Sequence, residues 1–179
     1  MIFYHKNKFF TPLTTHVELK KVHKLFKNTN SMVTKIENLY FTLVNDFKIK
    51  RPKMIIAGIN PHVGENNAIS KDDRKYLLPI IKRLRKKGIF IKGPVAGDGM
   101  INNQNLKKYE TFIFTFHDQA LIPFKILSNY EGVNFTSNLD IIRVSPDHGT
   151  GKDIIRKNLA NPKSLLESIK FFKNINVRT

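Results

Sequence analysis

The sequence predicts a single α/β domain over residues 1–179, built as a layered sheet with strands and helices in alternation. Two observations lead to this fold class. Apolar runs at 53–59 and 111–116 each end in a polar loop, as buried strands of α/β proteins do. Apolar residues with helical spacing recur at 17–46 and 71–87. A chain of this length holds one compact domain with a real core.

The amino-terminal part of the chain predicts helices before the first strand. Apolar residues with helical spacing run through 17–46 and are interrupted at 28–31, which indicates two helices. A strand is expected at 53–59. The polar segment 61–67 that follows it is expected to be a loop.

The next helix, 71–87, has clear signals at both ends. Ser70 is its expected N-cap, and the acidic residues Asp72 and Asp73 suit its first turn. Gly88 is expected to end it. The elements expected after it are a short strand at 89–92, a Gly-rich loop at 93–99, a strand at 111–116, a helix or irregular turn at 119–128, one or two strands within 132–143 that end at Arg143, a loop at 145–151, and a helix near 162–173 opened by Pro162.

The composition narrows the class of protein. Hydrophobic residues make up 41% and charged residues 25% of the chain, as in soluble globular proteins. There is no cysteine, so a disulfide framework, a Cys-ligated zinc site and a Cys nucleophile are excluded. No apolar run is long enough for a membrane span, and no hydrophobic signal segment follows Met1. We therefore expect a cytoplasmic protein with no membrane partner.

The net charge of +17 raises the alternative of a nucleic-acid-binding protein. Lys far outnumbers Arg, however, and Lys is scattered from Lys6 to Lys173. The densest basic run, 82–87, falls on the expected outer face of a helix. This pattern is typical of a compositional bias, so we expect no nucleic-acid partner. The charge still favours an anionic substrate such as a phosphorylated metabolite.

Three histidines lie in short polar motifs. His62 and His117 follow the two clearest strands, and His16 follows Thr14-Thr15. Three neutral imidazoles are able to bind one divalent ion and leave positions open for substrate. Their spacing matches no local metal motif. The alternative is that each histidine forms hydrogen bonds within its own loop.

Other polar residues are candidates for acid–base chemistry and for binding anions. Asp98 and Asp118 are candidate general acids or bases, or supports for a metal site, although an Asp in a Gly-rich loop is also a common turn residue. Lys and Arg side chains suit phosphate or carboxylate groups, but each is also a common surface charge. The candidates downstream of His117 are Lys125, Asn134, Arg143 and the loop Asp147-His148-Gly149-Thr150, which a tight turn explains almost as well.

Five motifs occur in the same order as in the 4-hydroxythreonine-4-phosphate dehydrogenase family, which the chain resembles from about Pro12 to Ile169. Family members are roughly twice this length, so the resemblance implies the carboxy-terminal half alone, the metal-bearing and dimerising half. The motifs are Asn60-Pro61-His62-Val63-Gly64-Glu65-Asn66, Gly93-Pro94-Val95-Ala96-Gly97-Asp98, His117-Asp118-Gln119-Ala120-Leu121-Ile122-Pro123-Phe124-Lys125, Gly132-Val133-Asn134, and Ile142-Arg143-Val144-Ser145-Pro146-Asp147-His148-Gly149-Thr150.

The resemblance implies a reaction and a fold. The reaction is an NAD- or NADP-dependent, divalent-metal-assisted oxidation of 4-phosphooxy-L-threonine to 2-amino-3-oxo-4-phosphooxybutanoate. This product loses carbon dioxide to give 3-amino-2-oxopropyl phosphate, a precursor of pyridoxal 5′-phosphate. The implied fold resembles that of isocitrate and isopropylmalate dehydrogenases. The metal would be zinc, magnesium or cobalt.

The resemblance also assigns roles to residues. It implies a homodimer with the metal site at the interface, where the ligand at the position of His117 comes from the partner chain. The implied metal ligands are His16, His62 and His117, the catalytic residues Asp98 and Asp118, the substrate-binding residues Lys125, Asn134 and Arg143, and the cofactor-binding residues His148, Gly149, Thr150 and Asn161.

Some positions depart from the family pattern. Gly99, Ala120, Gly151 and Lys152 replace the residues usual there. Three hypotheses follow: a split dehydrogenase that acts with the missing half supplied as a separate chain, a non-catalytic dimeric metal-binding remnant, and, remotely, a basic nucleic-acid-binding protein.

Overall fold

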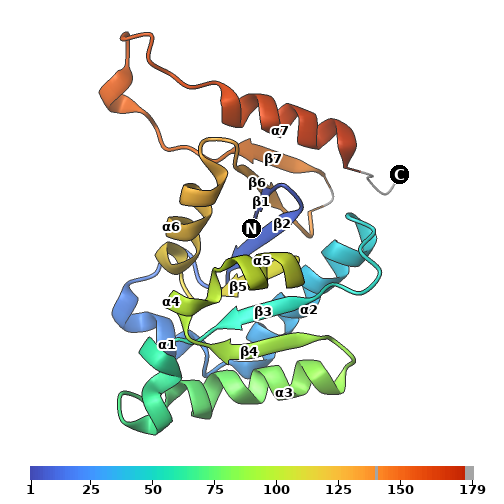
Figure 1. Ribbon diagram of the computed structural model, residues 1–179, viewed down its shortest axis with the longest axis vertical. Helices are drawn as coiled ribbons and strands as arrows, with labels where there is room; N and C mark the ends of the chain where they lie inside the picture. The colour runs from blue at the N-terminus through green and yellow to red at the C-terminus, as the bar shows by residue number, and fades with distance from the viewer. Residues whose placement is uncertain (140, 176–179) are drawn as a thin grey trace.

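One mixed sheet forms the centre of the molecule. The structure is a computed structural model that describes residues 1–139 and 141–175 (Figure 1). Its strands are β1 (Ile2–His5), β2 (Lys8–Pro12), β3 (Met54–Ala57), β4 (Ile91–Val95), β5 (Thr111–Phe114), β6 (Val133–Thr136) and β7 (Arg143–Pro146). Over the described residues the strand order is β4-β3-β5-β2-β1-β6-β7. The chain is therefore a mixed α/β protein, as the sequence predicted.

The sheet has a parallel part and an antiparallel part. Strands β4, β3, β5 and β2 run parallel to one another, and their carboxyl ends share one edge. Strand β1 is antiparallel to both β2 and β6, and β7 is antiparallel to β6. Loops that follow the parallel strands therefore gather at a single edge of the sheet, where α/β proteins commonly bind ligands.

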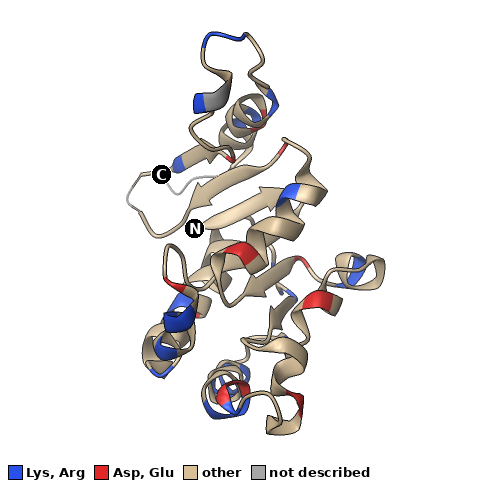
Figure 2. Cartoon of the chain, turned by 90° about the vertical axis from the view of Figure 1, so that its left-hand side faces the viewer, with Lys and Arg blue, Asp and Glu red and all other residues tan. Residues whose placement is uncertain are grey.

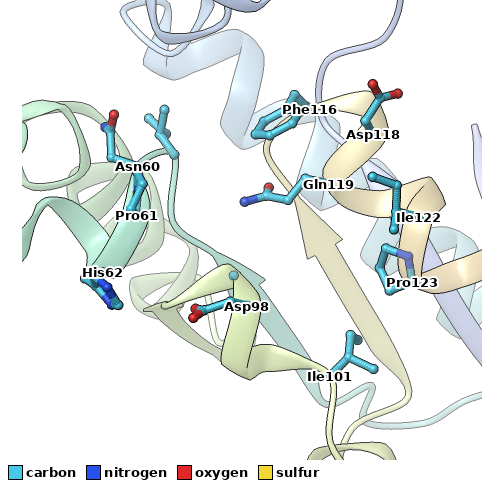
Figure 3. A pocket seen from close by; sticks show the side chains of 12 residues that line it. Asn60, Pro61, His62, Asp98, Ile101, Phe116, Asp118, Gln119, Ile122 and Pro123 are labelled. Atoms are coloured by element: carbon cyan, nitrogen blue, oxygen red, sulfur yellow. The ribbon is translucent and has the colours of Figure 1, made fainter.

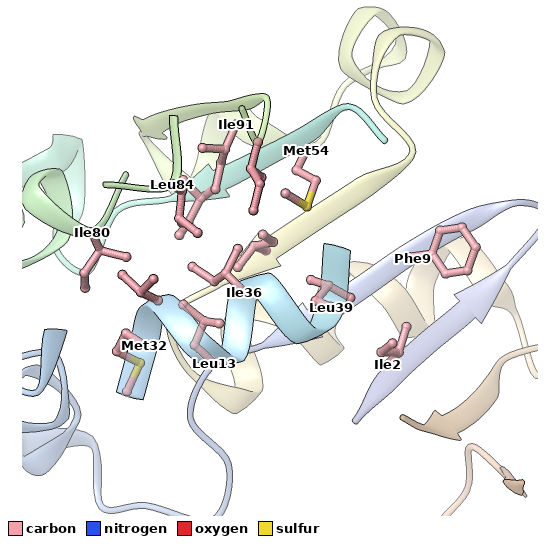
Figure 4. Close-up of a cluster of buried hydrophobic side chains, with 14 of the residues drawn as sticks. Ile2, Phe9, Leu13, Met32, Ile36, Leu39, Met54, Ile80, Leu84 and Ile91 are labelled. Carbon is pink, nitrogen blue, oxygen red and sulfur yellow. The ribbon is translucent and has the colours of Figure 1, made fainter. Parts of the chain in front are cut away.

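Helices cover both faces of this sheet (Figure 1). The helices are α1 (Val22–Leu25), α2 (Thr29–Asn45), α3 (Leu78–Lys86), α4 (Gly97–Met100), α5 (Asn103–Lys108), α6 (His117–Ser128) and α7 (Lys163–Asn174). Residues of α2, α3 and α7 pack on one face with alternate strand residues such as Phe9, Met54 and Ile113 (Figure 4). Residues of α4 and α6 pack on the other face, against Phe10, Phe112 and Phe114. Buried side chains on both faces make this a three-layer fold.

Most expected elements are present with shifted ends. Residues 26–28 separate α1 from α2, so the break lies before most of the interruption expected at 28–31, and α3 follows a π-helical turn, Asp73–Leu77. The Ser70 hydroxyl accepts a hydrogen bond from the Asp72 N–H at 3.2 Å, and Gly88 has a positive φ of 78°. Gly88 follows the end of the helix as expected, but Ser70 is not its N-cap, because Asp72 stands at that position and no side chain caps the turn. The helix expected at 119–128 begins at His117 itself.

Three predictions about strands and loops were wrong. Residues 1–12 were assigned no element, but they form the β1–β2 hairpin. The strand expected to end at Arg143 begins there, because β7 pairs antiparallel with β6 and takes up part of the expected 145–151 loop. Asp140, within the predicted 132–143 region, lies outside the described residues. The Gly-rich loop contains the end of β4 and the short helix α4.

The basic residues lie mainly on helices and loops around the sheet (Figure 2). In α3 the residues Lys82, Arg83, Arg85 and Lys86 are exposed, while Leu84 is buried. The expected outward orientation of this run is confirmed. Among the described helices, none has the length and hydropathy needed to cross a membrane.

Candidate functional site

The loops after β2 and β5 are joined at the carboxyl edge of the sheet. Leu13 continues the ladder beyond β2 with a hydrogen bond from its N–H to the Phe114 oxygen at 2.8 Å. The buried Thr14 hydroxyl then donates to the Thr115 oxygen at 2.8 Å. These two bonds fix the chain just before His16 and just before His117.

The two histidines carried by these loops lie side by side. The ring centroids of His16 and His117 are 5.6 Å apart. Nδ1 of His117 is 2.7 Å from Oδ1 of Asp118, and both side chains are partly or largely exposed. When Nδ1 carries the hydrogen of this bond, Nε2 keeps the lone pair that a metal ion needs. The arrangement offers a supported imidazole next to a second one.

His62 lies on a separate loop after β3. Residues His62, Val63, Gly64, Glu65 and Asn66 all have positive φ, so the segment is a left-handed turn. His62 lines a cavity of about 490 Å³ together with Asp98 of α4 and Gln119 of α6 (Figure 3). In Figure 3 the Gln119 amide reaches from α6 toward β3, while Asp118 points away from His62 and Asp98. His62 and Asp98 therefore lie on one side of the cavity, and the residues of α6 lie on the other.

A neighbouring cavity of about 400 Å³ holds the other two histidines. It is lined by residues that include His16, His117 and Glu18, and it shares Phe116 and Asp118 with the His62 cavity. The three histidines therefore line two adjoining cavities. Within residues 1–139 and 141–175, no three His, Asp or Glu side chains are close enough together to hold a metal ion. The structure joins His16 to His117 in one chain and leaves His62 apart from them.

Gln119 was not among the expected site residues, although it belongs to the quoted His-Asp-Gln motif. Its Oε1 accepts hydrogen bonds from the N–H and the hydroxyl of Thr115, at 2.8 and 2.9 Å. Its Nε2 donates to the Gly58 oxygen at 3.0 Å. Gln119 therefore links the ends of β5 and β3. Its position directly after His117-Asp118 was the signal in the sequence.

The expected anion-binding residues lie farther along α6 and on β6 and β7. Lys125 follows His117 by two helical turns, roughly 12 Å along the axis. Its Nζ is 3.7 Å from Oδ1 of Asp147, whose side chain is only 10% exposed. Burial raises the pKa of the Asp147 carboxyl above its ordinary value, and the ammonium of Lys125 opposes that rise. Lys125 is half exposed and keeps hydrogen atoms free for a ligand.

The other two residues of this group are on adjacent strands. Oδ1 of Asn134 on β6 is buried and has no hydrogen-bond partner. Arg143, at the start of β7, is exposed, and its Nη1 donates to the Thr136 hydroxyl at 3.4 Å. An unpaired buried amide oxygen is costly unless a ligand or water supplies a donor. The buried hydroxyls of Thr11 and Thr111 lack a partner too, so this feature alone does not assign a binding role to Asn134.

The expected cofactor residues lie in the segment between β7 and α7, which projects from the sheet (Figure 1). His148, Gly149, Thr150 and Asn161 are all exposed. Nδ1 of His148 is 3.0 Å from the Gly149 oxygen, and Oδ1 of Asn161 accepts from the Lys163 N–H at 3.0 Å. Asn161 therefore stabilises the start of α7.

Comparison with known proteins assigns the family. A family model described as pyridoxal phosphate biosynthetic protein PdxA matches residues 1–172. The chain belongs to the PdxA family. A relative from Sulfurihydrogenibium sp. (strain YO3AOP1), named 4-hydroxythreonine-4-phosphate dehydrogenase, is 38% identical over 157 residues, which are 88% of this chain and 48% of the relative. One of the same name from Roseobacter denitrificans is 36% identical over 167 residues, 93% of this chain and 51% of the relative.

Solved PdxA-family structures have the same fold. The crystal structure of a 4-hydroxythreonine-4-phosphate dehydrogenase from Burkholderia phymatum matches with a TM-score of 0.80 and 28% identity, over 99% of this chain and 54% of that one. A putative 4-hydroxythreonine-4-phosphate dehydrogenase from Salmonella typhimurium matches with a TM-score of 0.75 and 30% identity, over 95% and 52%. The expected family is confirmed, and this PdxA chain spans about half the length of the relatives it matches.

Proposed function

We propose that this PdxA chain supplies the metal-binding and part of the substrate-binding machinery for the NAD- or NADP-dependent oxidation of 4-phosphooxy-L-threonine. The observation that carries the proposal is the meeting of the His16 and His117 loops at the carboxyl edge of the sheet, next to the cavity of His62. The names of the relatives support the reaction class. The oxidised product, 2-amino-3-oxo-4-phosphooxybutanoate, decarboxylates to 3-amino-2-oxopropyl phosphate on the way to pyridoxal 5′-phosphate.

The donor set fits a divalent ion in part. His16 and His117 form a pair of neighbouring imidazoles, and the Asp118 carboxylate supports one of them. We propose that a homodimer completes the set. The resemblance implies that His117 comes from the second copy, whereas the pairing of His16 with His117 within one chain favours His62 as the imidazole that the second copy supplies. Zinc, magnesium or cobalt bound there would lower the pKa of the substrate hydroxyl and polarise the carbonyl formed from it.

The remaining residues would bind and orient the reactants. Lys125 and Arg143 would hold the anionic ends of the substrate, and the free Oδ1 of Asn134 would accept a hydrogen bond from it. Asp118, in contact with His117, and Asp98, which lines the cavity of His62, would move a proton or support a ligand. His148, Gly149, Thr150 and Asn161 would contact the nicotinamide dinucleotide. We also propose that the fold is related to that of isocitrate and isopropylmalate dehydrogenases. The proposed location of the protein is the cytoplasm.

Because the chain spans about half of its relatives, we propose that turnover needs a separate chain carrying the other half. Nicotinamide reduction is measured with 4-phosphooxy-L-threonine, NAD or NADP, and zinc or magnesium, first with this chain alone and then with the amino-terminal half of a relative added. His16→Ala and His62→Ala should each abolish turnover, and His23→Ala on α1 is the matched control.

Two other results would change the proposal. Turnover that survives His62→Ala and His16→Ala would remove the proposed metal set. Zinc binding without turnover, even with the added half, would favour a non-catalytic dimeric metal-binding remnant. The gel-filtration volume of the chain, with and without zinc, tests the dimer in either case.

A further inference from the structure

Asp73 is a fully buried carboxylate at the start of the π-helical turn. It is 0% exposed, and its side chain forms no ion pair with a described Lys or Arg. Oδ1 accepts a hydrogen bond from the Ile59 N–H at 2.7 Å. Oδ2 accepts from the Asn60 N–H at 3.1 Å and from Asn60 Nδ2 at 3.0 Å. All three donors belong to the segment just before His62.

The His62 segment is one that needs such support. Five non-glycine residues in it have positive φ, from 43° at Glu65 to 75° at Asn67. L-residues are strained in this region, and for a β-branched residue such as Val63 the conformation is a clear outlier. A turn of this kind persists only when contacts outside it determine its path.

The contact between Asp73 and the loop is also very close. A Cβ on Gly58 would lie 2.9 Å from Oδ1 of Asp73, so only glycine fits at this position. The Gly58 oxygen meanwhile accepts from Nε2 of Gln119. The end of β3 is therefore held from the α3 side by Asp73 and from the α6 side by Gln119. Asp73 lies in a π-helical turn. Such turns are rare in proteins, and those that occur are often found at functional sites.

We propose that Asp73 is the positioning residue of His62: its carboxylate sets the path of the left-handed turn and thereby the direction in which the His62 imidazole faces its cavity. A carboxylate suits this task because it accepts three N–H groups and offers none. An amide side chain at the same position would place one of its N–H groups opposite the N–H donors of Asn60, where no hydrogen bond can form. This inference rests on the proposed role of His62 as a metal ligand.

Asp73→Asn is the direct test, with Asp72→Asn as the matched control for the loss of one negative charge. Zinc affinity of the folded chain is measured by titration calorimetry. Asp73→Asn should weaken it about tenfold or more, as removing support behind a ligand does. Asp72→Asn should leave it within about twofold, since the Asp72 side chain does not hold the His62 loop.

A second readout follows the loop itself. Amide hydrogen exchange at Ile59 and Asn60 should be about tenfold faster in Asp73→Asn, while exchange in β5 stays unchanged. Asn60→Ala removes only one of the three hydrogen bonds and should therefore disturb folding less. The exchange rate should rise in this variant too, but by a smaller factor.

The two proposals fail in different ways. If wild-type chain binds no zinc, the metal role of His62 fails, and the exchange rates alone then decide whether Asp73 holds the turn. If Asp73→Asn and Asp72→Asn match in zinc affinity and in the exchange of Ile59 and Asn60, Asp73 does not position His62.

Discussion

The side-chain amide of Gln119 donates a hydrogen bond to the main-chain oxygen of Gly58, at 3.0 Å, and thereby joins the first turn of α6 to the end of β3. The oxygen of the same amide accepts both donors of Thr115. One side chain thus connects the two strands whose loops carry His62 and His117. The position of His62 relative to His117 therefore depends on the Gln119 side chain.

Gln119→Ala should lower the free energy of unfolding by about 2 kcal/mol, because three hydrogen bonds worth about 1 kcal/mol each are lost and partly regained with water. Gln119→Glu keeps the acceptors for Thr115 but sets a carboxylate oxygen against the Gly58 oxygen, so it should lose at least as much. Urea denaturation measures both. A loss below about 0.5 kcal/mol in Gln119→Ala would mean that packing, not the amide, joins the strands.

Gly64→Ala should destabilise the chain by at least about 2 kcal/mol. Gly64 has a φ of 76°, and a Cβ there would lie 2.1 Å from the Ser70 oxygen, a main-chain atom that cannot move alone. Gly99→Ala is the control, since nothing lies within 4 Å of its Cβ and it is part of α4. That change should be neutral or stabilise by up to about 1 kcal/mol. Equal melting temperatures for the two variants would contradict the left-handed turn.

Ser164→Ala should loosen α7 from the sheet. The buried Ser164 hydroxyl accepts from the Asp147 N–H at 2.7 Å and donates to the Gly132 oxygen at 2.6 Å. Its removal leaves two main-chain groups unpaired, at a cost of about 2 kcal/mol. Ser168→Ala loses only a bond within the helix, to the Ser164 oxygen, and serves as the comparison. Amide exchange in α7 should accelerate only in Ser164→Ala, and unchanged exchange in both variants would reject this anchoring role.

The stability of Asp147→Asn should differ from wild type in a pH-dependent way. Burial raises the pKa of Asp147 in the folded chain. The folded state therefore binds the proton more tightly, and the resulting stabilisation is present below the ordinary carboxyl pKa and lost as pH rises through the raised value. An Asn side chain does not titrate and has no such loss. The unfolding free energy of the variant should therefore rise relative to that of wild type between about pH 4 and pH 7. Urea denaturation of both proteins at these two pH values measures the effect. If the difference in unfolding free energy between variant and wild type is the same at both, burial does not raise the pKa of Asp147.

Several elements were predictable because local patterns and tertiary packing agree there. Helix α3 has a buried stripe, Ile80, Ile81 and Leu84, with charges between, and strands β3 and β5 are continuous buried runs. The loops that carry His62 and His117 follow from the ends of β3 and β5. The proximity of His16 to His117 could not be anticipated, because it depends on the pairing of β2 with β5 and the sequence did not indicate β2.

The β1–β2 hairpin was missed because its signals are weak in the sequence. Its turn consists of Lys6 and Asn7, both with positive φ, so it lacks the glycine that usually marks such a turn. Strand β2 is nearly continuously buried and shows no polar alternation. The role of Asp73 was also unpredictable. Its carboxylate contacts a loop 13 to 14 residues away, and only the fold reveals that contact.

The position of that hairpin has a consequence for the order of assembly. Although β1 and β2 come first in the chain, they lie in the middle of the sheet, between β5 and β6. During synthesis they must wait for partners that begin at Thr111 and Val133. Such long-range pairing slows folding. Phe3, Phe9 and Phe10 of these two aromatic strands therefore stay without their sheet neighbours until β5 and β6 have been made.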